Sequence, residues 1–147
     1  GRLLVLYMIV VVKFCDIGAY FTGCRFGRHK LIPRISPAKS WEGCIGGVAT
    51  SIATSLVFTL ALGGRVGPVH IPAGHAILIG LGLGVVGILG DLAESLLKRA
   101  AGVKDSGAIL PGLGGLLDVI DSLLPAAPVV YFYARFVLEP VVPVLIR

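Results

Sequence analysis

The sequence predicts an all-α, polytopic membrane protein whose helices form one transmembrane bundle. Of its 147 residues, 56% are hydrophobic and 14% are charged, whereas soluble domains carry roughly 25% charged residues. Mean hydropathy is +0.94, and the alternation of a transmembrane barrel is too weak to favour that fold. We therefore expect a single membrane-embedded domain over residues 1–147, with about four spans and two basic cytoplasmic loops.

Four segments are long and apolar enough to be spans, since a helix needs about 20 mostly apolar residues to cross a hydrocarbon core of ~30 Å. The clearest contains no charged residue, and another follows a loop and runs on past Asp91. The last is started or kinked by Pro125 and Pro128. In chain order the four segments cover residues 3–24, 44–62, about 74 to beyond 91, and 122–138.

Many glycines lie inside these apolar runs, and small residues let membrane helices approach closely. We expect this packing role for four glycines of the third segment: Gly80, Gly82, Gly84 and Gly87. The three cysteines have neither CxxC nor Cys/His spacing, so a zinc site and a disulfide framework are not expected.

Positive charge is concentrated in two connections. Residues 25–42 hold five cations against Glu42 alone, and residues 98–104 add three more, whereas residues 63–75 hold only Arg65. The positive-inside rule places the two basic connections in the cytoplasm. We therefore expect a multi-pass protein of the cell (inner) membrane whose polar site faces the cytoplasm.

Ionisable residues inside spans are costly and mark partners or function. Offsets of 0, 3, 4 and 7 place Asp91, Glu94, Ser95 and Lys98 on one helical face at the end of the third span. Asp118 and Asp121 are also three apart, at the start of the fourth span, where a helix N-terminus favours anions. Together they predict a polar patch at the membrane surface.

The connection between these acids contains KDSG and PGLGG. Its glycines let backbone approach phosphate oxygens, and Lys98, Arg99 and Lys104 supply cationic donors. Acids on the flanking helices can hold Mg²⁺, which proteins bind through one or two carboxylates plus substrate phosphates. The pattern indicates a nucleotide-phosphate and metal site, although a gating cluster of salt bridges has similar charges and stays an alternative.

The first basic loop, GRHKLIPRISPAKSWEG, mixes cations with serines and prolines and suits an anionic head group. Its candidate contacts are Arg34, Ser36 and Lys39. Just before it, Lys13 and Asp16 lie one helical step apart, and an intramembrane ion pair explains both without any chemistry.

Two ordered motifs resemble those of the phosphatidate cytidylyltransferases, also called CDP-diacylglycerol synthases. One motif comprises Asp16, Gly18-Ala19-Tyr20-Phe21, Gly23, Phe26-Gly27, Ile35-Ser36-Pro37, Lys39 and Glu42-Gly43. The other comprises Ser95, Lys98-Arg99, Lys104-Asp105, Gly107, Pro111-Gly112, Gly114-Gly115, Asp118 and Asp121. The chain departs from the family signature where Leu113 replaces the usual His and Val119 the usual Arg, so no role of that His carries over.

The resemblance implies transfer of a cytidylyl group from CTP to phosphatidate, giving CDP-diacylglycerol and pyrophosphate. It implies Mg²⁺ held by Asp91 and Asp118, with a second metal ion left open. The lipid phosphate is the nucleophile, so positioning and charge neutralisation carry the reaction. The implied catalytic residues are Asp91, Lys98, Lys104, Asp118 and Asp121. The implied substrate-binding residues are Arg34, Ser36, Lys39, Ser95, Arg99, Asp105, Gly112, Gly114 and Gly115.

Family members are longer, so the chain is expected to be the carboxy-terminal catalytic part of a longer protein, and too incomplete to act alone. The expected partners are CTP, phosphatidate and membrane lipid, with a homodimer left open and no nucleic acid. A CTP-dependent lipid kinase, a transporter and an inactive fragment remain alternatives. A CDP-alcohol phosphotransferase is not favoured, because its aspartate spacing is absent.

Overall fold

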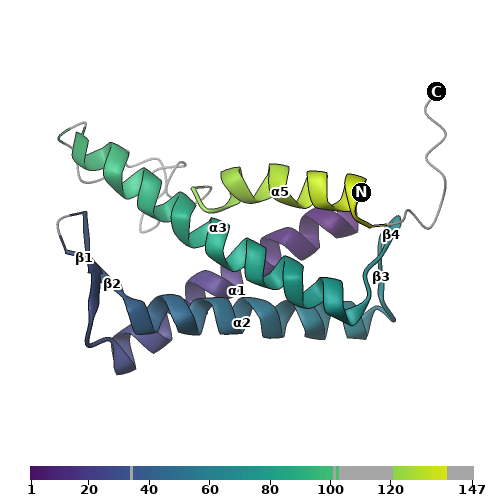
Figure 1. The fold of residues 1–147 in the computed structure, drawn as a ribbon, viewed down its shortest axis with the longest axis horizontal. Coiled ribbons are helices and arrows are strands. Elements are labelled where there is room, and N and C mark those ends of the chain that lie inside the picture. Colours follow the sequence, from purple (N-terminus) through teal and green to yellow (C-terminus); the bar gives the residue numbers. More distant parts are fainter. Residues whose placement is uncertain (34, 101, 103–120, 139–147) are drawn as a thin grey trace.

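A computed structural model shows a helical bundle with a short hairpin at each end (Figure 1). The structure describes residues 1–33, 35–100, 102 and 121–138. The helices are α1 (Arg2–Phe26), α2 (Trp41–Ala61), α3 (Ala73–Ala100) and α5 (Leu123–Phe136). The strands are β1 (Lys30–Ile32), β2 (Ser36–Ser40), β3 (Arg65–Val66) and β4 (Val69–His70).

The predicted helical membrane bundle is confirmed. Helices α1, α2 and α3, with 25, 21 and 28 residues, are long and apolar enough to cross a membrane. Helix α5 has 14 residues and is shorter than a usual span. Pro125 lies in the first turn of α5, where its missing N–H costs no helical hydrogen bond.

The structure adds two antiparallel hairpins that the all-α prediction lacked. In β1–β2, Lys30 pairs with Ser40 and Ile32 with Ser36, with an irregularity between these pairs. In β3–β4 the chain turns tightly, and Gly67 has a φ of +66°, a value that favours glycine. The hairpins sit in connections that composition alone indicated as loops.

Helices α1 and α2 are in close contact because small residues face one another. A Cβ atom added to Gly47 would lie 2.9 Å from Ala19 Cβ, and one added to Gly43 would lie 2.9 Å from the Ala19 carbonyl oxygen. A Cβ on Gly18 would clash with Thr50. This contact brings the amino-terminal end of α2 against the carboxy-terminal end of α1.

Helices α2 and α3 also meet through glycine and serine. Ser51 Oγ donates to the Gly80 carbonyl, and Ser55 Oγ donates to the Ala76 carbonyl at 2.5 Å. The predicted packing role is confirmed for Gly80 and Gly84, which lie against α2, and for Gly87, whose added Cβ would contact Val12 at 3.6 Å. For Gly82 it stays a prediction, since a Cβ there would meet nothing within 4 Å among the described residues.

The apolar core lies toward the β3–β4 end, between α1, α3 and α5. Its fully buried side chains include Tyr7, Val11, Val12, Val66 and Leu83. The Tyr7 hydroxyl forms a hydrogen bond of 2.6 Å with Ser55 Oγ, which satisfies the polar atom inside this core. The opposite, β1–β2 end of the bundle is thereby left for polar groups.

Gly80→Ala should lower the melting temperature of the protein in detergent, because the new Cβ would lie 2.7 Å from Ile52 Cα and must push α2 and α3 apart. Overpacking of this kind costs about 1–3 kcal/mol. Gly82→Ala is the matched control on the same helix, because the new methyl group would meet nothing within 4 Å in the part of the chain that the structure describes. Equal melting temperatures for the two variants would contradict the close contact.

Candidate active site at the β1–β2 end of the bundle

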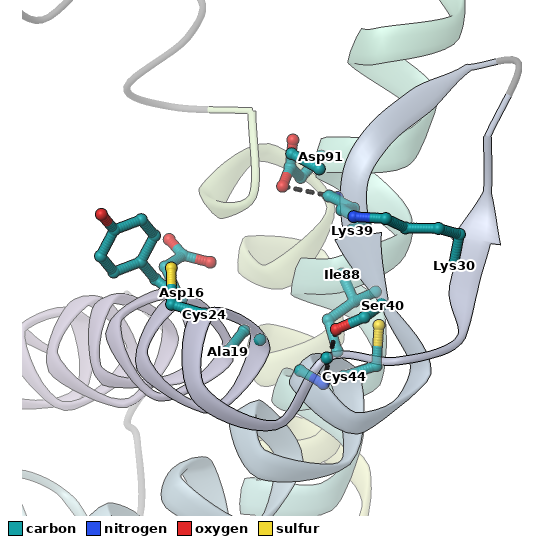
Figure 2. Close-up of a pocket in the computed structure, with 14 residues that line it drawn as sticks. Asp16, Ala19, Cys24, Lys30, Lys39, Ser40, Cys44, Ile88 and Asp91 are labelled. Atoms are coloured by element: carbon teal, nitrogen blue, oxygen red, sulfur yellow. Dashed lines mark hydrogen bonds and ion pairs between the residues drawn. The ribbon is translucent and has the colours of Figure 1, made fainter.

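A cavity of about 500 Å³ opens where the β1–β2 hairpin meets α1, α2 and α3 (Figure 2). Its charged lining residues are two acids and two lysines. The lining residues are Asp16, Ala19, Tyr20, Gly23, Cys24, Gly27, Lys30, Ala38, Lys39, Ser40, Gly43, Cys44, Ile88 and Asp91. The cavity is therefore built by residues from both halves of the chain.

Lys39 and Asp91 form an ion pair across this cavity, with 2.5 Å between Lys39 Nζ and Asp91 Oδ2 (Figure 2). Lys39 Nζ is buried and makes no further hydrogen bond among the described residues. The backbone around Lys39 is fixed because the next residue, Ser40, pairs with Lys30 and caps α2 by accepting from the Gly43 N–H at 3.1 Å. The hairpin thus aims this lysine at α3.

A second anchor holds the entry to the hairpin. Glu42, in the first turn of α2, pairs with His29 Nδ1 at 2.6 Å. Its carboxylate also accepts hydrogen bonds from the backbone N–H groups of Arg28 and His29. The sequence motif includes this acid without indicating a role. In the structure Glu42 links the α1–β1 turn to α2.

Three carboxylates gather beside the cavity. Oxygens of Asp91, Glu94 and Asp121 lie within 4.8 Å of one another and form a candidate metal site. Asp91 and Glu94 are one turn apart on α3, and Asp121 comes from the chain just before α5. The absence of a side chain at Gly90 permits this approach, because a Cβ there would lie 2.7 Å from the Asp121 carbonyl oxygen.

Two acids of the cluster pair with lysines, and the third accepts a backbone hydrogen bond. Glu94 is buried, with 6% of its surface exposed, and pairs with Lys98 at 3.0 Å one turn along α3. Asp91 pairs with Lys39, and Asp121 Oδ1 accepts from the Ser122 N–H at 2.5 Å. Carboxylate oxygens are the donors that Mg²⁺ prefers, so the cluster fits a hard divalent cation.

The intramembrane pair of Lys13 and Asp16 is confirmed, at 3.3 Å and one helical step apart. Ser122 joins it: its hydroxyl accepts from Lys13 Nζ and donates to Asp16 Oδ2, both at 3.4 Å. Because Ser122 follows Asp121, the pair ties α1 to the segment that carries one acid of the cluster.

A family model described as the Cytidylyltransferase family matches residues 1–137. The chain belongs to this family. It is 43% identical to the phosphatidate cytidylyltransferase of Haemophilus influenzae over 139 residues, 94% of this chain and 48% of that protein. It is 50% identical to the phosphatidate cytidylyltransferase of Pseudomonas aeruginosa over 127 residues, 86% of this chain and 45% of that protein. The chain therefore spans about half the length of these curated relatives.

The fold of this cytidylyltransferase family member also has a solved counterpart. It matches an intramembrane enzyme for archaeal membrane lipids biosynthesis with a TM-score of 0.59, over 85% of this chain and 77% of that chain. The two sequences are 21% identical, so the likeness concerns the fold alone. It agrees with the predicted membrane-embedded helical bundle.

The structure brings together several of the residues that the sequence predicted for the site. Asp91, Asp121 and Lys39 lie at the cavity or the acidic cluster. Lys98 does not line the cavity but pairs with Glu94 of the cluster. Glu94 was placed on the polar face without a ligand role, and its spacing of three from Asp91 was the signal for one.

The other predicted residues either do not line the cavity or lie outside the described residues. Arg99 Nε donates to the Ile35 carbonyl at 3.5 Å and so contacts the hairpin. Ser36 begins β2 and Ser95 is half-buried on α3, and neither lines the cavity. The remaining predicted residues lie outside the described residues: Arg34, Lys104, Asp105, Gly112, Gly114, Gly115 and Asp118, together with the departures Leu113 and Val119.

Lys13→Met should destabilise the protein by roughly 1 to 2 kcal/mol, because it leaves Asp16 without this cation. Both side chains are partly buried, so the expected loss lies between the values for exposed and for buried ion pairs. The melting temperature in detergent measures the loss. In Lys13→Met/Asp16→Leu the uncompensated acid is gone, so part of the stability should return. A double variant less stable than Lys13→Met would argue against the pair.

Proposed function

We propose that this chain carries the active site of a phosphatidate cytidylyltransferase and is the carboxy-terminal catalytic part of a longer protein. An oxygen of the phosphatidate phosphate attacks the α-phosphorus of CTP, and the bond from that phosphorus to the pyrophosphate leaving group breaks. The products are CDP-diacylglycerol and pyrophosphate. The observation that carries the proposal is the acidic cluster beside a lysine-lined cavity in a membrane bundle. The names of the relatives support the substrates.

In this proposal Asp91, Glu94 and Asp121 hold Mg²⁺, and Asp118 remains a predicted further ligand. A divalent cation held there would neutralise phosphate charge. A second metal ion stays a prediction. Compared with the ligands expected from the sequence, Asp91 and Asp118, the proposal adds Glu94 and Asp121, whose carboxylates lie with that of Asp91.

Different cations are proposed to bind different phosphate groups of the substrates. Lys30 and Lys39 line the cavity and suit the phosphates of CTP. Lys98, Arg99 and Lys104 are proposed to bind the triphosphate or the leaving pyrophosphate, while Arg34 and Ser36 hold the lipid head group or close over the nucleotide. Roles in substrate binding also remain predictions for Ser95, Asp105, Gly112, Gly114 and Gly115.

The site is proposed to face the cytoplasm from the inner membrane. The exposed basic residues Arg25, Arg28 and Lys30 all lie at the β1–β2 end, on the same side as the cavity. Cytoplasmic loops of membrane proteins carry an excess of such residues. A homodimer stays a prediction.

The decisive experiment uses two forms of labelled CTP with the intact protein and phosphatidate in detergent micelles. Label in the cytidine should enter the lipid product, and label in the γ-phosphate should leave with pyrophosphate. Transfer of the γ label to lipid would instead identify a CTP-dependent lipid kinase. If the protein does not turn over CTP but moves substrate into lipid vesicles in a separate assay, it is a transporter.

A further inference from the structure

The ion pair between Lys39 and Asp91 joins the cavity to the acidic cluster. Asp91 belongs to both: it lines the cavity, and its carboxylate lies within 4.8 Å of those of Glu94 and Asp121. The bond from Lys39 therefore occupies an oxygen of an acid that is itself a candidate metal ligand. Lys39 and a metal ion would therefore compete for the carboxylate of Asp91.

A divalent cation makes the charge of the site more positive. Among the described residues, the three carboxylates of the cluster face the ammonium groups of Lys39 and Lys98. A divalent cation adds two positive charges to this group. The ion therefore favours the approach of a polyphosphate.

Lys39 is suited to exchange the carboxylate of Asp91 for a phosphate group in the cavity. An ammonium group has three donors, and among the described residues Lys39 Nζ meets Asp91 and makes no further hydrogen bond. The side chain comes from the hairpin and reaches over the cavity, in which Lys30 is a second cation (Figure 2). A phosphate in the cavity would offer Lys39 the acceptors that it lacks.

We propose that Lys39 is a resident counter-ion of Asp91, which divalent-cation binding displaces and which then binds the phosphates of the nucleotide in the cavity. The inference rests on the proposed function, because it takes the acidic cluster as the metal site. It couples the two ligands: the metal ion frees the lysine, and the freed lysine contributes to nucleotide binding. Lys39 thereby opposes the metal ion when nucleotide is absent.

A different arrangement makes the opposite prediction. Acids that bind metals are often held by hydrogen bonds to their other oxygen, and loss of such a partner weakens metal binding. If Lys39 only supports Asp91 in this way, Lys39→Met must lower the affinity for metal. The direction of the change therefore separates displacement from support.

The first experiment measures Mn²⁺ binding to the intact protein in detergent micelles, without nucleotide. Lys39→Met should bind Mn²⁺ roughly tenfold more tightly than the wild type, the change that one competing charged hydrogen bond of about 1.4 kcal/mol produces. With Mn²⁺ present, a non-hydrolysable CTP analogue should bind this variant roughly tenfold more weakly. Lys30→Met is the matched control, since it removes a cation from the same cavity, and Lys30 has no ion pair among the described residues. Its Mn²⁺ affinity should change by less than about twofold, because an exposed charge is screened.

A second experiment uses the wild type, so it does not depend on the folding of a variant. An amine-reactive reagent followed by mass spectrometry reports how accessible each lysine is. Labelling of Lys39 should rise when Mg²⁺ is added and fall again when the CTP analogue follows. Labelling of the exposed Lys30 should not respond to Mg²⁺ alone.

The outcomes separate this inference from the proposed function. If the wild type binds Mn²⁺ and Lys39→Met binds it equally or more weakly, the displacement is wrong while the metal site stands. Lys39 labelling that ignores Mg²⁺ in a protein that binds the ion has the same meaning. If only Lys39→Met binds Mn²⁺, Lys39 blocks the metal site and the ion does not displace it in the wild type, so the inference is overturned while the metal site stands. If neither protein binds Mn²⁺, both the inference and the metal site are overturned.

Discussion

Asp91→Asn should lower CDP-diacylglycerol formation by about 10²- to 10³-fold, the loss seen when one group that stabilises transition-state charge is removed. The amide keeps the shape of the side chain but takes away the charge that a divalent cation requires. Asp91 is the acid common to the cavity and the cluster, so its loss should affect metal and nucleotide together. The rate of label transfer from cytidine-labelled CTP measures the effect, and a melting temperature close to that of the wild type shows that the fold is retained.

A charge swap tests whether Asp91 serves only as the partner of Lys39. The double variant Lys39→Asp/Asp91→Lys restores opposite charges across the cavity. A purely structural ion pair predicts recovery of activity relative to Asp91→Lys alone, because the attraction is symmetric. A metal ligand predicts no recovery, since an ammonium group cannot replace a carboxylate oxygen at about 2.0–2.1 Å from Mg²⁺.

The helices could be predicted from the sequence because their cause is local. Long runs without charge can satisfy backbone hydrogen bonds in a bilayer only as helices or barrels, and α2 lies over the clearest such run. The hairpins could not be predicted this way. Strand β2, SPAKS, contains a proline and lacks alternation, and β3 and β4 have two residues each.

In the acidic cluster, too, only the contacts between residues close in sequence could be predicted. Helical spacing predicts that Asp91 and Glu94 share a face, and also that Glu94 and Lys98 can pair. The approach of Asp121 depends on the packing of Gly90 against the start of α5. The partner of Lys39 is an acid 52 residues away, and only the folded hairpin selects it. Sequence reasoning assigned this lysine to substrate and missed the ion pair.

Glu94→Gln should weaken Mn²⁺ binding and lower turnover by about 10²-fold, at the lower end of the range for one lost stabilising group. Glu94 is the most buried acid of the cluster, with 6% of its surface exposed, so its charge acts in a medium that screens it poorly. It also pairs with Lys98, and a purely structural role therefore predicts a lower melting temperature with unchanged Mn²⁺ affinity.

The matched control for Glu94→Gln is Glu42→Gln, the same chemical change at an acid that also pairs with another side chain. Glu42 ties the α1–β1 turn to α2 through His29 and lies outside the acidic cluster. We expect Glu42→Gln to increase proteolysis near residues 28–30 and to leave Mn²⁺ affinity unchanged, because it loosens the hairpin without removing a metal ligand. If the two variants change Mn²⁺ affinity equally, the effect of Glu94 is a general one of lost negative charge. The site would then be reduced to Asp91 and Asp121, with Glu94 serving to hold Lys98 on α3.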